Sequence, residues 1–235
     1  FSTLEHSFDN GWVVKGQYNH QVNGYNAPLG ALLDPDASTG LAPMLARKYT
    51  GEYVSDSGDL FASGPFSLLG REHQLVVGGS VAKSHWTGKD YTNAKMVDNA
   101  YDYYNWDGDS LEPDWGNVTS YNDETTRQTG TYMTARLSLT DDLTLMLGTR
   151  VADYTLTGTS HAKDTGKVLP YAGVIYDLNE NISAYASYTE IFLPQSYYRD
   201  RDNKMLEPDE GTNYELGLKG EFFDGRLNSS LAYFE

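Results

Sequence analysis

Tight and long connections alternate along this chain, and they join stretches in which apolar and polar residues alternate. Residues 128–139 run into residues 143–154 across only three residues, and residues 170–178 run into residues 182–192 across another three. The connections between such hairpins are much longer, and the longest, residues 88–127, is crowded with Tyr, Trp and Asp. Long amphipathic strands with tight turns at one end and elaborate loops at the other are typical of a transmembrane β-barrel. Residues that carry the function are therefore expected at the elaborate end.

The composition agrees with a strand-rich membrane protein and excludes several other classes. Only 39% of the residues are hydrophobic, and no apolar run reaches the length of about 18 residues that a membrane-spanning helix needs. The 19 Tyr and 23 Gly against 8 Pro favour strands with aromatic belts. The chain has no Cys, which excludes disulfides and thiolate metal sites. A net charge of −16 argues against a nucleic-acid partner, because phosphate binding needs a basic surface.

The alternation predicts an all-β, antiparallel fold of about ten strands. The expected strands are residues 1–8, 12–22, 49–66, 74–86, 128–139, 143–154, 170–178, 182–192, 214–223 and 226–234. Tight turns, expected on the periplasmic side, fall at residues 9–11, 69–73, 140–142, 179–181 and 224–225, and long extracellular loops at residues 23–48, 88–127, 158–167 and 194–210. A soluble β-sandwich also alternates, but its strands are usually only about 5–6 residues long.

The phase of the alternation predicts which side chains meet lipid. Six apolar residues should point to the convex, lipid-facing side: Met133, Leu137, Leu145, Leu147, Leu216 and Leu218. Five charged residues should point to the concave side: Arg136, Arg150, Glu215, Lys219 and Glu221. A slip of one residue in the strand register would invert every one of these assignments.

Several motifs resemble one family of outer-membrane proteins. Residues 185–195, Tyr-Ala-Ser-Tyr-Thr-Glu-Ile-Phe-Leu-Pro-Gln, resemble a strand and loop entry of TonB-dependent siderophore receptors. Residues 206–221 are similar to the acidic, Pro-containing loop of that family and the Tyr-Glu-x-Gly-x-Lys strand after it. Matches to the ferric-pyoverdine and ferric-coprogen branch are residues 62–66 with 70–78, and residues 104–108 with 112–115. These matches follow one another along nearly the whole chain.

The resemblance implies a segment of a barrel of about 22 strands that imports ferric siderophore of hydroxamate or pyoverdine type across the outer membrane of a Gram-negative bacterium. It implies energy from the TonB complex, transmitted through a plug-bearing region, and contact with outer-membrane lipid and lipopolysaccharide. Residues 1–235 would all belong to the barrel domain, without plug or signal peptide, because both ends fall inside alternating stretches. No cofactor or metal site is expected, since the iron arrives chelated by the siderophore.

Candidate ligand-binding residues lie on the long-loop side, because a bulky chelate needs stacking surfaces and hydrogen bonds. The aromatic candidates are Tyr101, Tyr103, Tyr104, Trp106, Trp115 and Tyr121 in the longest loop, with Trp86 at its base. A second group, Tyr197, Tyr198, Arg199 and Arg201, could pair with siderophore oxygens. The alternatives are an aromatic belt or loop packing for the first group, and a salt-bridge network with Asp200 and Asp202 for the second.

Other functions remain as alternatives to siderophore uptake. A haem receptor is less favoured because residues 192–210 contain no His. A porin and a protease active at the barrel rim are the other options. His85 near Asp90 and His161 near Asp164 are the acid–base pairs to consider, but no nucleophile motif accompanies them, so we expect no enzyme. The spacing Asp107-x-Asp109-x-x-Glu112 only partly fits a calcium loop.

Overall fold

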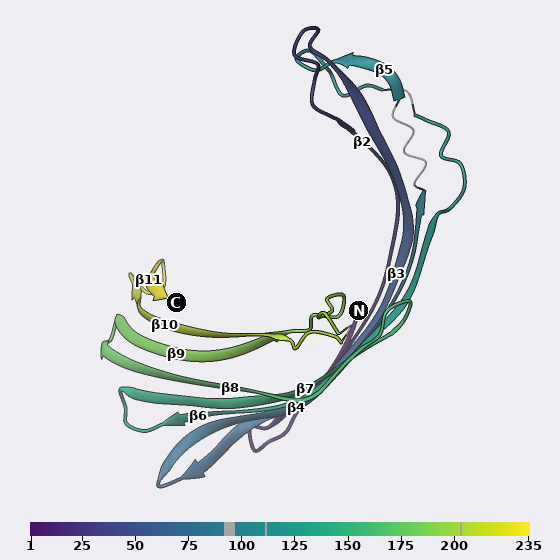
Figure 1. Cartoon of the computed structure of the whole chain (residues 1–235). Coiled ribbons are helices and arrows are strands. Elements are labelled where there is room, and N and C mark those ends of the chain that lie inside the picture. The colour runs from purple at the N-terminus through teal and green to yellow at the C-terminus, as the bar shows by residue number, and fades with distance from the viewer. Residues whose placement is uncertain (92–96, 111, 203) are drawn as a thin grey trace. The chain divides into compact units, whose positions relative to one another are not determined.

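The computed structural model describes residues 1–91, 97–110, 112–202 and 204–235, and each regular element among them is a β-strand (Figure 1). The strands are β1 (Ser2–Ser7), β2 (Val13–Leu32), β3 (Leu41–Leu68), β4 (Arg71–Tyr91), β5 (Val97–Asp102), β6 (Ser120–Ser138), β7 (Leu143–Gly158), β8 (Ala162–Asn179), β9 (Ile182–Leu193), β10 (Asp209–Phe222) and β11 (Leu227–Phe234). Within the described ranges we find no apolar helix of membrane-spanning length.

Ten of these strands form one sheet in the order β1-β2-β3-β4-β6-β7-β8-β9-β10-β11, and β5 pairs with β3 outside this path. Neighbours pair antiparallel, as β7 with β8 and β9 with β10 illustrate. The predicted antiparallel all-β fold is therefore confirmed. The strands are long enough to cross a bilayer, for which a tilted strand needs about 9–11 residues.

Two of the predicted loops are wrong in extent. Residues 23–48 are mostly strand, since β2 continues to Leu32 and β3 begins at Leu41. The predicted loop 88–127 contains β5, and β6 already begins at Ser120. These segments are rich in Gly, Pro and Ala and lack alternation, so backbone pairing between distant strands, rather than a local pattern, makes them extended. The loop predicted at residues 194–210 is confirmed, because β9 ends at Leu193 and β10 begins at Asp209.

The described chain divides into two compact units. Unit 1 comprises Phe1–His20, Asp56–Lys83 and Thr126–Glu235, and unit 2 comprises Gln21–Ser55 and Ser84–Thr125. In unit 1 each strand from β6 to β11 reverses the direction of the one before, so the turns near residues 140–142, 180–181 and 224–225 lie at one end of these strands. The connections at residues 159–161 and 194–208 lie at the other end, as predicted.

The strand register of unit 1 separates an apolar face from a polar face. Leu216 lies opposite Ala186, Ala186 opposite Val174, and Val174 opposite Leu145, so these residues share one face. On the other face Tyr171, opposite Gly148, hydrogen-bonds to Thr134 of β6. By alternation along each strand, the six predicted apolar residues lie on the first face and the five predicted charged residues on the second. We call these the apolar face and the polar face.

The Tyr-Glu-x-Gly-x-Lys motif of β10 forms a cradle for one ring of β9. The Tyr185 hydroxyl donates a hydrogen bond to Glu215, and Lys219 Nζ lies 4.8 Å from the centre of the Tyr185 ring. Between them Gly217 leaves room for the ring, because a Cβ built at Gly217 would lie only 2.6 Å from Tyr185 Cε1. The three motif residues on the polar face therefore act together on Tyr185.

Candidate ligand-binding loops

The tip of the β2–β3 hairpin in unit 2 is fixed by one carboxylate. Asp36 Oδ1 accepts hydrogen bonds from Ser38 N at 2.8 Å, from Ser38 Oγ at 2.5 Å and from Thr39 N at 2.9 Å. These bonds, first the one from the Ser38 hydroxyl, hold the pKa of Asp36 below its usual value because they stabilise the ionised form. The turn is therefore formed with Asp36 charged.

β5 adds the predicted aromatic segment to this hairpin. Leu41 pairs with Asp102 and Ala42 with Tyr101, and Tyr103 N donates to Gly40 O at 3.1 Å. The turn that follows is capped by Asp102, which accepts hydrogen bonds from Asn105 Nδ2 at 2.7 Å and Tyr104 N at 3.1 Å. The Asn105 side chain is the main cause of a lowered pKa of Asp102. The aromatic residues 101–104 thus start from an ordered backbone.

Four of the predicted aromatic residues gather around this turn. Tyr103 and Tyr104 are 45% and 76% exposed and meet edge to face with ring centres 5.5 Å apart. Tyr101 and Trp106 are tilted against each other at 6.5 Å, and Trp106 Nε1 donates to Asp109 O at 2.7 Å. Tyr103 and Tyr104 therefore offer accessible ring surface, whereas the Trp106 N–H is already used inside the loop.

Trp115 packs within unit 2. Its Nε1 donates to Glu112 Oε1 at 2.5 Å, and Lys48 Nζ lies 6.0 Å from its ring centre. Together with the buried Met44 and Ala46 it lines a small cavity of about 180 Å³. These contacts favour the loop-packing interpretation for Trp115. Tyr121 is half-exposed and donates a hydrogen bond to Asp123 at 3.4 Å.

Three strands of unit 2 contribute an aromatic platform of which the sequence predicted only Trp86. The Trp86 ring of β4 stacks on Tyr53 of β3 with ring centres 5.6 Å apart and an interplanar angle of 10°, and its Nε1 donates to Tyr25 Oη of β2 at 3.3 Å. Tyr25 and Tyr53 are 38% and 41% exposed. We call Tyr25, Tyr53 and Trp86 the Trp86 platform. Tyr25 was missed because its strand was taken for a loop, and nothing in the sequence pairs it with Trp86.

The second predicted group lies in unit 1, in the loop between β9 and β10. Tyr197 and Tyr198 are 63% and 65% exposed. Arg199 pairs with Met205 in a β-bridge and donates from Nη2 to the His161 carbonyl at 3.1 Å. Arg201 is exposed. The group thus presents two accessible rings beside two arginines.

The alternative salt-bridge network for these arginines is not formed. In the described part of the chain no ion pair joins Arg199 or Arg201 to Asp200 or Asp202. Asp200 Oδ1 instead accepts hydrogen bonds from the main-chain N–H groups of Asp202 at 2.9 Å and Lys204 at 2.8 Å. Its carboxylate therefore shapes the loop and leaves the arginine heads to other partners.

The candidate acid–base and calcium residues have local partners. His85 Nε2 lies 2.8 Å from Asp123 Oδ1, so its partner is not the predicted Asp90. Asp107 Oδ1 accepts the Asp109 N–H at 3.0 Å, which makes a turn. Among the described residues no cluster of three or more His, Asp or Glu is arranged to hold a metal ion.

Comparison with known proteins agrees with this architecture. The family model described as "TonB dependent receptor-like, beta-barrel" matches residues 1–235. The ferripyoverdine receptor of Pseudomonas aeruginosa is 57% identical over 239 residues, covering 100% of this chain and 29% of the relative. The ferric-pyoverdine BN7/BN8 receptor of Pseudomonas putida is 38% identical over 258 residues, with 100% and 31% covered. The crystal structure of the Pseudomonas aeruginosa outer-membrane ferripyoverdine receptor bound to ferripyoverdine superposes with a TM-score of 0.92, at 57% identity, covering 99% of this chain and 31% of that one. The chain thus spans less than a third of the length of these relatives.

Proposed function

Because the chain belongs to the TonB-dependent receptor β-barrel family, we propose that it forms part of the barrel of an outer-membrane receptor that imports a ferric siderophore. The 57% identity to a ferripyoverdine receptor over the full chain is the observation that carries this proposal, and it favours a pyoverdine-type ligand. The two faces of unit 1 supply the physical support, since one suits lipid and the other a watery lumen. The receptor would be a transporter rather than an enzyme.

The iron needs no protein ligand in this proposal, because the siderophore oxygens already coordinate it. What the receptor must supply is ring surface and hydrogen bonds, and unit 2 has both at the Trp86 platform and at Tyr103 and Tyr104. In unit 1, Tyr197, Tyr198 and the Arg201 guanidinium offer the same chemistry toward the carboxylate or hydroxamate oxygens of a siderophore. Energy would come from the TonB complex through a plug-bearing region, in the outer membrane of a Gram-negative bacterium.

Titration of cells that carry the full-length receptor with radiolabelled ferric pyoverdine tests this function and the site together. Trp86→Ala should raise the dissociation constant roughly 5- to 150-fold, because a desolvated aromatic anchor contributes about 1–3 kcal/mol. The matched control is Trp115→Ala, which should lower thermal stability and leave the affinity of the folded receptor unchanged.

The comparison also separates the function from the site. A wild-type receptor that binds no ferric pyoverdine or other ferric hydroxamate would contradict the function. Normal binding by Trp86→Ala at matched receptor abundance would remove the platform from the ligand site. The double variant Trp106→Ala/Trp115→Ala should weaken binding only if the Trp106 ring contacts ligand, because Trp115 already packs on the hairpin.

A further inference from the structure

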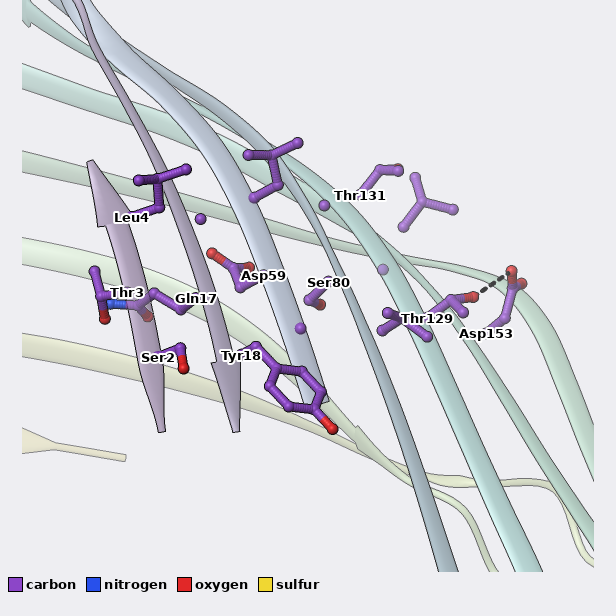
Figure 2. Close-up of a pocket in the computed structure, with 17 residues that line it drawn as sticks. Ser2, Thr3, Leu4, Gln17, Tyr18, Asp59, Ser80, Thr129, Thr131 and Asp153 are labelled. Atoms are coloured by element: carbon purple, nitrogen blue, oxygen red, sulfur yellow. Dashed lines mark hydrogen bonds between the residues drawn. The ribbon is translucent and has the colours of Figure 1, made fainter. Parts of the chain in front are cut away.

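The largest hollow in unit 1 is a groove of about 730 Å³ that six strands line, β1, β2, β3, β4, β6 and β7 (Figure 2). Its apolar walls are Leu4, Leu60, Val81 and Val151, all of which are exposed. Thr131 of β6 is another lining residue and alternates in phase with Met133, so the groove opens on the apolar face.

The groove exists because three neighbouring strands lack a side chain at the same level. Gly16 lies opposite Leu4, and a Cβ built on Gly16 would lie 3.7 Å from Leu60 Cδ1. A Cβ on Gly58 would lie 3.8 Å from Val81 Cγ1, and one on Gly79 would lie 3.8 Å from Thr131 Cγ2. These are ordinary van der Waals distances, so no neighbouring side chain fills the space above these glycines, unlike Gly217 on the polar face. The floor is open to an external apolar chain.

Charged residues mark the loop-side end of the groove. Asp56 accepts a hydrogen bond from Tyr18 Oη at 2.5 Å and lies 2.8 Å from His20 Nδ1. Asp153 accepts hydrogen bonds from Thr129 Oγ1 at 3.3 Å and from Gly166 N at 2.8 Å. Both carboxylates are therefore satisfied within the protein.

Two cations lie on the same face just beyond these carboxylates. Lys83 is two residues past Val81 on β4, and Arg127 is two residues before Thr129 on β6, each toward the long loops. Neither of them belongs to an ion pair among the residues that the structure describes. In a chain with a net charge of −16 this pair stands out as a place for an anion.

We propose that the groove binds lipopolysaccharide, with one acyl chain over Gly16, Gly58 and Gly79 and a lipid A phosphate between Lys83 and Arg127. The proposal rests on the proposed outer-membrane function, which directs the long loops outward and the cationic end toward the outer leaflet. Hydrocarbon gains burial in the open floor, while the two cations select a lipid with phosphate at that depth. An acyl chain without phosphate would leave the cations unpaired.

Native mass spectrometry of the full-length receptor, extracted in mild detergent, measures the lipopolysaccharide retained per receptor. Gly16→Val with Gly58→Val should fill the floor without strain, because neither glycine has a positive φ and valine suits a strand. We expect a roughly tenfold fall in retained lipopolysaccharide, which corresponds to about two methylene groups no longer buried. The matched control is Ala186→Val, which adds the same bulk to the apolar face on β9, outside the groove.

A charge variant keeps the test decisive if the filled groove impairs assembly. Lys83→Gln with Arg127→Gln leaves the floor intact and should also reduce retained lipopolysaccharide, more strongly at low salt than at high salt. Equal retention by wild type and both variants, or phospholipid retained in place of lipopolysaccharide, would overturn the proposal. Ferric pyoverdine binding by the same preparations separates the two ideas: intact binding with unchanged lipopolysaccharide rejects the groove alone, and absent binding by wild type rejects the function.

Discussion

Replacing Gly217 by Ala in the full-length receptor should destabilise the barrel wall at the β10 cradle. A Cβ at this position would lie 2.6 Å from Tyr185 Cε1 and 2.7 Å from Cζ and Oη. The ring would have to retreat by about 0.8 Å to reach an ordinary contact of 3.4 Å, away from Glu215 and from under Lys219. Overpacking of this kind costs about 1–3 kcal/mol.

Gly58→Ala on the apolar face is the matched control for this prediction. Its Cβ would meet its nearest atoms at 3.8 Å, so the substitution adds no clash and should stabilise by about 0.4–1 kcal/mol through the unfolded chain. The two alanine variants should therefore differ by about 2 kcal/mol. With a typical dependence on urea of about 2 kcal/mol per molar, their unfolding midpoints should lie about 1 M apart.

Urea unfolding of the receptor in detergent, followed by the loss of the folded band in unheated gel electrophoresis, measures this difference. In a Tyr185→Ser background Gly217→Ala should become nearly neutral, because the ring that it displaces is gone. Equal midpoints for Gly217→Ala and Gly58→Ala in the Tyr185 background would refute the cradle. So would an additive double mutant.

Three further outcomes follow from the described contacts. Protection of the β2–β3 tip from protease should fall as the pH drops through the lowered pKa of Asp36, since a depressed folded pKa confers stability only while the group is ionised; Asp36→Ala should remove that pH dependence. Trp115→Ala should expose the cavity over Met44 and lower the thermal midpoint, as seen by tryptophan fluorescence. Tyr132→Phe should cost about 1 kcal/mol in urea unfolding by removing its hydrogen bond to Asp59, and an Asp59→Asn background should shrink that effect.

Local alternation was enough to place most of the barrel strands and both faces of unit 1. The phase of Leu216 and Lys219 follows from residues two apart, and a two-residue turn such as Asp224-Gly225 fixes the register of the hairpin around it. The extended parts of β2 and β3 escaped prediction because residues such as Pro28 and Pro43 break the pattern. Their strand structure comes from pairing with distant segments, which a single sequence does not show.

The candidate site was predictable in composition but not in arrangement. The crowding of Tyr and Trp in residues 88–127 pointed to the loop that holds Tyr103 and Tyr104. The stacking of Trp86 on Tyr53 depends on the β3–β4 register, and the role of Trp115 depends on which hairpin its loop covers. The salt bridges expected around Arg199 are not formed because Asp200 is used by the backbone of its own turn.

The pairing of β5 with β3 has a consequence for the order of folding. Ala42 and Tyr101 are 59 positions apart, whereas β3 and β4 are joined by a turn of two residues. Closing a loop becomes more costly with its length, by about 0.6 kcal/mol for each doubling. The β3–β4 hairpin can therefore zip first and shorten the route for β5, which docks later on an edge that already exists. We expect the aromatic segment around Tyr103 to be the last part of unit 2 to become ordered, so the surface that meets the ligand matures after the wall that carries it.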